Sequence, residues 1–254
     1  VERTSPAIPT LASLLRCDDV ELLADTCQAF LYIADPDDGI QAVVDSGVTP
    51  RLVELLWHKD AAVQRPALLA LGSICSAESP VPTQAVLDAS ALPAVLGLLQ
   101  HESARIRQEA CYLLSNVAGG TKEQCGRVVG LTGMLEAMVT AARDDSRDVR
   151  KEATWVLANI VSHGEAEFVR EAVRAGALGA FKEAVEENGP SRAPAITGLL
   201  DVLRAGEGAP GDNLYASKIV RMHGRDWLGA AGRDGELGEI LKILSSVKSP
   251  EAGE

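Results

Sequence analysis

Two pairs of side chains, each spaced four residues apart, have the types needed to hold a cationic peptide. Tyr112 is followed by Asn116, and Trp155 by Asn159, so each aromatic ring shares a helix face with a carboxamide. An asparagine offers two donors and an acceptor to the backbone of an extended peptide. An aromatic face attracts the cation of a lysine or arginine and supports its methylenes. The chemistry indicated is recognition of a peptide rather than catalysis.

Acidic and hydroxyl side chains accompany these pairs. Glu109 and Glu152 stand one helical turn before the two aromatic residues and supply counter-charge for a bound cation. The candidate peptide-binding residues are therefore Ser73, Glu109, Tyr112, Ser115, Asn116, Glu152, Trp155 and Asn159.

An internal repeat must position these residues. Segments that begin polar, become apolar at helical spacing and end in a small or polar residue recur along the chain. Their equivalent positions, separated by steps of 41, 43, 43 and 42 residues, are Gln28, Leu69, Tyr112, Trp155 and Thr197. A second element, a short helix followed by a small-residue turn and another helix, recurs between them. A period of about 40–47 residues with two or three helices is typical of HEAT and armadillo arrays.

We therefore expect an all-α, right-handed armadillo superhelical solenoid of three-helix repeats, with the third and longest helix of each repeat lining a concave groove. The low aromatic content of 4% agrees with helices rather than a β-sandwich or barrel. We divide the chain into five repeats, a C-terminal cap and a tail. The repeats are residues 7–46, 47–89, 90–131, 132–175 and 176–207, and capping helices with a tail occupy 208–254.

The aromatic residues have a simpler interpretation as core residues. We call the equivalent position of each repeat its slot. In other repeats the slot holds Gln28 and Thr197, which do not suit a core. We therefore expect Tyr112 and Trp155 to face the groove. Packed helices lie about 10 Å apart, a distance that an extended peptide covers in about three residues.

Composition excludes several other functions. The net charge of -12 disfavours nucleic acid and anionic membranes but attracts basic peptides. No apolar stretch is long enough to cross a membrane, and no secretory signal is evident. Five cysteines without a CxxC spacing and four scattered histidines predict reduced thiols, no metal site and no cofactor. No catalytic motif is present, so we do not expect an enzyme.

Four segments resemble the armadillo repeats of the importin-α (karyopherin-α) family, the nuclear-import adaptors. They read QAVVDSGVTPRLVELL, RPALLALGSI, QEACYLLSN and KEATWVLAN. The order and spacing are similar to those of the C-terminal half of the family, from about its fifth repeat to its tenth. The resemblance implies an adaptor that binds basic nuclear localisation signals, here in the minor-site half of an acidic groove.

The resemblance also assigns roles to residues. The family's minor site sandwiches an arginine between two tryptophans over a glutamate, and the matching positions are Tyr112, Trp155 and Glu152. Asn116 and Asn159 match the asparagines that hold the signal's backbone.

Elsewhere the chain departs from the family. Gln28 replaces a tryptophan, Leu69 and Ser73 stand where the family usually has Arg and Asn, and Asp201 replaces a further Asn. These departures leave two hypotheses open: a divergent adaptor with weakened binding, or an armadillo scaffold that binds no signal peptide.

The partners implied by the resemblance are cargo signals, an export receptor at the C-terminal cap, and importin-β. The basic N-terminal segment that recruits importin-β has no counterpart in this sequence. Trp227 in the cap is a candidate for the export-receptor surface if it does not serve packing. The implied localisation is the cytoplasm and the nucleus, between which such adaptors shuttle.

Overall fold

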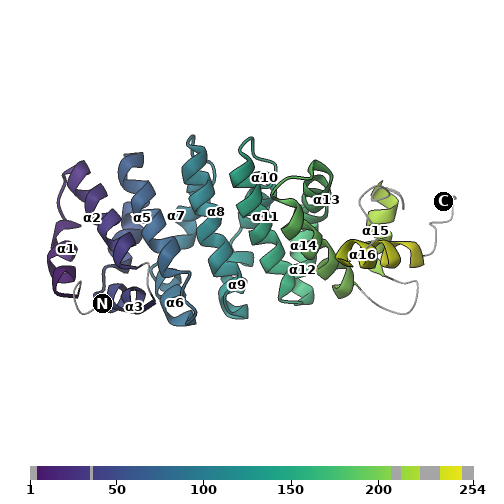
Figure 1. The fold of residues 1–254 in the computed structure, drawn as a ribbon, viewed down its shortest axis with the longest axis horizontal. Helices are drawn as coiled ribbons and strands as arrows, with labels where there is room; N and C mark the ends of the chain where they lie inside the picture. Colours follow the sequence, from purple (N-terminus) through teal and green to yellow (C-terminus); the bar gives the residue numbers. More distant parts are fainter. Residues whose placement is uncertain (1–4, 35–36, 207–212, 224–234, 248–254) are drawn as a thin grey trace.

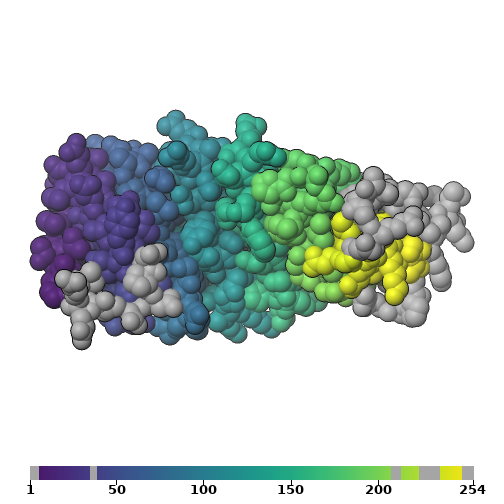
Figure 2. Space-filling model, in the orientation of Figure 1, coloured from purple at the N-terminus to yellow at the C-terminus, as the bar shows by residue number. Residues whose placement is uncertain are grey.

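A computed structural model describes residues 5–34, 37–206, 213–223 and 235–247. Every regular element within these ranges is a helix, which confirms the all-α prediction. Figure 1 shows the helices following one another along the long axis of the molecule, and Figure 2 shows the same succession in the space-filling view. Within the described ranges no single helix meets the length and apolarity needed to cross a bilayer, although one bent pair, residues 80–88 and 91–98, passes on length and composition alone.

Long helices stand side by side and form what we call the ladder (Figure 1). Each packs against the next one, so that elements about 40 residues apart in sequence are neighbours in space. The ladder helices are α2 (Val20–Ile33), α5 (Ala61–Ile74), α8 (Ala104–Ala118), α11 (Arg147–Ser162) and α14 (Arg192–Ala205).

Shorter helices connect the members of the ladder and cover their buried sides. They are the 3-10 turn η1 (Ser5–Ala7), α1 (Ile8–Leu14), α3 (Asp37–Asp45), α4 (Thr49–Leu55), α6 (Pro80–Asp88), α7 (Ala91–Leu98), α9 (Lys122–Val129), α10 (Met134–Ala141), α12 (Ala166–Ala175) and α13 (Ala177–Glu187). The division into five repeats stays a prediction.

The C-terminal helices are α15 (Leu214–His223) and α16 (Gly235–Ser246). Within the predicted cap, residues 208–254, the structure describes 213–223 and 235–247, so Trp227 lies outside the described residues. Helix α16 packs against α14, where the Arg204 guanidinium donates two hydrogen bonds of 3.0 Å to the Glu239 carboxylate. In this way α16 packs over the C-terminal side of the ladder.

Local sequence explains where the ladder helices begin. The Asp19 carboxylate accepts a hydrogen bond from the Leu22 backbone N–H at 2.9 Å, and Asp60 accepts one from Ala62 at the same distance. Both are N-caps that satisfy a free amide in the first turn. Each ladder helix then buries an apolar stripe, exemplified by Phe30 and Leu113, whose exposed fractions are both 0%. Cys27, Cys75, Cys111 and Cys125 are buried too, and burial raises the pKa of the Cys27 thiol to about 12.

Arginines at the start of two ladder helices tie successive repeats together. Arg107 donates hydrogen bonds of 2.6 and 2.8 Å to the Asp144 carboxylate and another to the His101 carbonyl. Arg150, 43 residues later, repeats the pattern with the Asp144 carbonyl and Glu187. The Arg107 hydrogen bond lowers the pKa of the Asp144 carboxyl below its ordinary value. These arginine contacts fix the position of each ladder helix relative to the next repeat. The slot residues of neighbouring helices are therefore held at the same level.

Candidate functional site

The slot residues lie at the accessible surface of the ladder. The exposed fraction is 37% for Tyr112 and 38% for Trp155, while Gln28, Leu69 and Thr197 are half-buried. Neither aromatic ring is therefore a core residue. Tyrosine and tryptophan are enriched at protein interfaces, so two partly exposed rings on neighbouring helices are candidates for contact with a partner.

A glycine on the neighbouring helix supports the Tyr112 ring. A Cβ atom at Gly72 would lie 3.1 Å from Tyr112 Cδ1 and 3.3 Å from Cε1. The ring consequently rests against the α5 helix at Gly72. The sequence analysis did not single out Gly72, because the contact joins residues 40 positions apart.

The two asparagines link adjacent ladder helices. The Asn116 Nδ2 donates to the Gly72 carbonyl at 3.1 Å, and the Asn159 Nδ2 donates to the Ser115 carbonyl at 3.0 Å. The Asn159 amide also contacts the Ser115 hydroxyl at 3.2 Å. Each asparagine therefore has a structural bond that the sequence did not predict. Among the described residues, neither carboxamide oxygen has a hydrogen-bond partner, so both remain available as acceptors.

Ser73 occupies the asparagine position on α5. Its hydroxyl donates to the Ala34 carbonyl at 2.8 Å and so makes the same kind of link to the preceding helix. Because this bond uses the hydroxyl hydrogen, Ser73 can offer a ligand only an acceptor.

The two glutamates are mostly buried and differ in their partners. Their side chains are 16% exposed for Glu109 and 15% for Glu152. Glu109 Oε1 lies 3.4 Å from an Arg65 nitrogen on α5, whereas Glu152 Oε1 lies 3.3 Å from Lys151 Nζ on its own helix. Burial raises the pKa of the Glu109 carboxyl; Arg65 opposes this shift and the Glu152 charge adds to it. The two carboxylates thus share one electrostatic environment.

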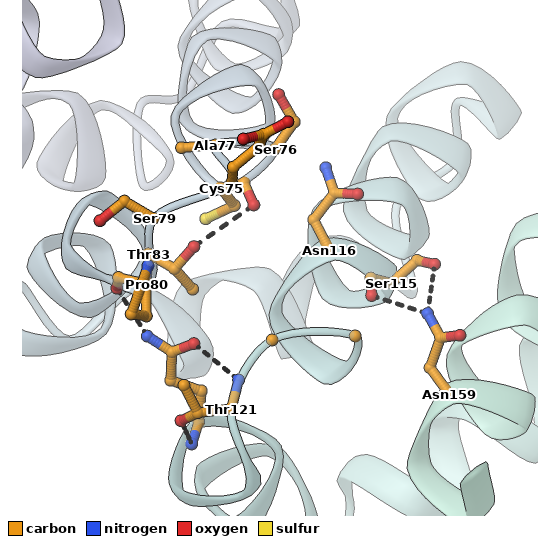
Figure 3. A pocket seen from close by; sticks show the side chains of 14 residues that line it. Cys75, Ser76, Ala77, Ser79, Pro80, Thr83, Ser115, Asn116, Thr121 and Asn159 are labelled. Carbon is orange, nitrogen blue, oxygen red and sulfur yellow. Dashed lines mark hydrogen bonds between the residues drawn. The ribbon is translucent and has the colours of Figure 1, made fainter. Parts of the chain in front are cut away.

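A polar pocket of about 550 Å³ adjoins the asparagines (Figure 3). It lies where α5 and α8 end and α6 and α9 begin, with Asn159 contributed by α11. Residues around it include Cys75, Glu78, Thr83, Ser115, Asn116 and Thr121. The Thr83 hydroxyl donates to the Cys75 carbonyl at 3.3 Å, so the Thr83 oxygen can still accept a hydrogen bond. The lining contains one carboxylate, that of Glu78, together with hydroxyl and carboxamide groups that can both donate and accept.

The structure gathers most of the predicted site residues on two helices. Glu109, Tyr112, Ser115 and Asn116 lie on α8, Glu152, Trp155 and Asn159 lie on α11, and Ser73 lies apart on α5. Arg65 was missed by sequence analysis, although its place one turn before Leu69 is a signal that it lies on the same helix face. No cluster of three or more possible metal ligands occurs within the described part of the chain.

Two segments of the chain match a known family of repeats. The model of the armadillo/beta-catenin-like repeat family matches residues 36–76 and 79–119. Similar stretches occur in importin subunit alpha-1a of Oryza sativa subsp. japonica, 47% identical over 78 residues, and in importin subunit alpha-4 of Arabidopsis thaliana, 49% identical over 74 residues. These matches cover 30% and 29% of this chain but only 15% and 14% of the relatives. The chain thus matches about one-seventh of the length of each relative.

Solved structures share the architecture over nearly the whole chain. An engineered protein with 28% sequence identity has a TM-score of 0.81, with coverage of 96% of this chain and 99% of that one. Computationally designed armadillo repeat proteins for modular peptide recognition, 22% identical, give 0.84 over 95% of this chain and 100% of theirs. The second likeness concerns the fold alone. It confirms the prediction of an armadillo solenoid.

Proposed function

We propose that this chain, an importin-α-like armadillo-repeat protein, is a nuclear-import adaptor that binds basic nuclear localisation signals across α8 and α11. The observation that carries the proposal is the pair of half-exposed rings, Tyr112 and Trp155, on adjacent ladder helices with Glu152 one turn away. A lysine or arginine side chain entering between the rings gains two cation–π contacts, each of about 0.5–2 kcal/mol.

The charge distribution supports a cationic ligand. Glu152 is mostly buried beside the Trp155 ring, and its only ion-pair partner among the described residues is Lys151, which is 43% exposed. An exposed lysine can swing into water and leave the carboxylate to a ligand at little cost. The net charge of -12 further attracts basic peptides to the molecule.

The asparagines supply the groups that hold the ligand's backbone. Asn116 and Asn159 are fixed by their bonds to the preceding helix, so their carboxamide oxygens are preorganised acceptors for peptide N–H groups. Each such bond contributes about 0.5–1.5 kcal/mol. Because the two residues are on neighbouring helices, they address successive parts of one extended peptide.

The pocket beside Asn116 provides a place for a second side chain. Thr83, Asn116 and Glu78 are among the residues that line it, and each carries an oxygen that can accept a hydrogen bond from an ammonium group. A lysine, with three donors on a flexible stem, fits this chemistry better than an apolar residue.

Under this proposal the partners are cargo proteins that display basic signals, with importin-β and an export receptor as further members of the transport cycle. The protein then shuttles between cytoplasm and nucleus. The similarity of the repeats to importin subunit alpha supports these roles. Binding rather than catalysis is the activity that the two rings and their acceptors favour.

A structural scaffold is the second candidate, and specific residues favour it. Leu69 gives the α5 slot no ring, and the Thr197 hydroxyl contacts the Glu236 carboxylate of α16 at 3.4 Å instead of facing a ligand. A scaffold would bind other protein surfaces and ignore basic peptides.

Calorimetric titration of the chain with a bipartite basic peptide and with its alanine-substituted counterpart separates the two candidates. The adaptor predicts measurable affinity for the basic peptide and none for the counterpart. Equal heats for the two peptides would favour the scaffold.

A further inference from the structure

A cation of the protein itself, Arg65, contacts Glu109, one helical turn before Tyr112. We call the space between two neighbouring ladder helices at this level a subsite. Arg65 extends from α5 toward α8 and places one guanidinium nitrogen 3.4 Å from Glu109 Oε1. Its side chain is 41% exposed, yet its Nε is buried and has no hydrogen-bond partner among the described residues. A buried donor without a partner carries a desolvation cost, so the Arg65 guanidinium has donors left over from its pair with Glu109.

The equivalent subsite on the next pair of helices is arranged differently. Glu152 faces no arginine from α8; its partner Lys151 is its immediate neighbour on α11. The subsite between α8 and α11 therefore has two rings and a carboxylate whose partner is a 43% exposed lysine of the same helix. The subsite between α5 and α8 has a carboxylate paired with Arg65, the single ring of Tyr112, and the apolar wall of Leu69.

We propose that Arg65 closes the subsite between α5 and α8 to a second basic residue. The preferred ligand then has a lysine or arginine between Tyr112 and Trp155 and an uncharged or acidic residue over Arg65. This inference rests on the proposed function and specifies the ligand class of the same site.

Electrostatics gives the direction of the preference. A second ligand cation at this subsite meets a Glu109 charge that Arg65 already offsets, and it is repelled by the guanidinium at short range. A ligand carboxylate, in contrast, finds unused guanidinium donors and forms a charge-assisted hydrogen bond. Adjacent ladder helices are about 8–10 Å apart. An extended peptide spans this distance in about two or three residues, so the discriminated position lies that far from the gripped cation.

The test uses a peptide series with one fixed lysine and a second position, two or three residues away on either side, occupied by Lys, Ala or Glu. Affinities are measured by calorimetry for the wild type, for Arg65→Gln and for Arg170→Gln. Arg170 lies on α12, outside the ladder, is 52% exposed, and its change alters the net charge by the same amount.

We expect the wild type to bind the Ala and Glu peptides at least as tightly as the Lys peptide. In Arg65→Gln, the Lys peptide should gain about fivefold in affinity relative to the Ala peptide, corresponding to about 1 kcal/mol. Arg170→Gln should leave this ratio unchanged. The melting temperature of Arg65→Gln should fall, because the mostly buried Glu109 carboxylate loses its partner, so affinities are compared well below the unfolding transition.

A wild type that prefers the Lys peptide, or a ratio that Arg65→Gln does not change, would overturn the inference while peptide binding itself persists. Failure of every peptide to bind the wild type would overturn the proposed function, and the inference with it.

Discussion

The middle of the ladder and its C-terminal end use the same helix packing to present different surfaces. In the middle, Tyr112 and Trp155 are more than a third exposed. At the end, the equivalent Thr197 contacts α16, and Asp201 is half-buried near Arg204. Packing fixes where a slot lies but not which residue fills it. Function must therefore be argued slot by slot.

The position four residues after each slot shows the same contrast. Asn116 and Asn159 donate to the preceding helix. Asp201, when ionised, has no hydrogen to donate, and burial raises the pKa of its carboxyl. At this position, α8 and α11 thus have an asparagine link to the preceding helix, and α14 has an acidic residue instead.

The largest change in stability should come from breaking the ion pair between Arg107 and Asp144 in the middle of the ladder. Arg107→Ala leaves the Asp144 carboxylate, 12% exposed, without its main partner. We expect a loss of about 3 kcal/mol in the free energy of unfolding, measured by urea denaturation at pH 7. Arg105→Ala, an exposed position on the same helix, is the control and should change little.

The Arg107→Ala effect should depend on pH. The folded-state pKa of Asp144 is lowered, so the stabilisation is present above the ordinary aspartate pKa and is lost as pH falls through the depressed value. The difference between variant and wild type should therefore shrink below about pH 4. An unchanged difference at pH 3 would show that the ion pair is not its source.

The next effect concerns peptide binding. Trp155→Ala removes one of the two rings. It should weaken the binding of a basic peptide by about 2 kcal/mol, or about 30-fold in affinity. Trp57→Ala is the matched control, since Trp57 is 65% exposed but lies beyond α4, away from the ladder face. Loss of folding in Trp155→Ala, or equal affinity in the two variants, would refute the ring pocket.

Exchanging residues between the two regions should change stability by smaller amounts. Asn159→Asp removes the donor to Ser115 and should cost about 1 kcal/mol. Asp201→Asn should be neutral or slightly stabilising, because it relieves a half-buried carboxyl. Thermal denaturation of both variants checks the pair, and a stable Asn159→Asp would show that the inter-helix bond contributes nothing.

The smallest effect is electrostatic. Glu152→Gln should weaken the binding of a basic peptide by about threefold at 20 mM salt and by less at 500 mM, because added salt screens the attraction between the carboxylate and the approaching cation. Glu167→Gln on α12 gives the control for net charge. Salt-independent weakening would indicate a packing role for Glu152.

Much of the fold followed from sequence because the apolar spacing is local. The 43-residue step from Tyr112 to Trp155 predicts neighbouring helices, and the two residues lie on α8 and α11. The bond from Asn116 to the Gly72 carbonyl did not follow, since it depends on how closely two helices approach. The pairing of Arg65 with Glu109 was missed for the same reason.

The most direct test of the account is a crystal structure of the chain with a lysine-rich or arginine-rich peptide. We predict a basic side chain between the rings of Tyr112 and Trp155, close to the Glu152 carboxylate, with peptide N–H groups donating to the Asn116 and Asn159 oxygens. A peptide bound elsewhere on the molecule, with these rings still open to solvent, would contradict it.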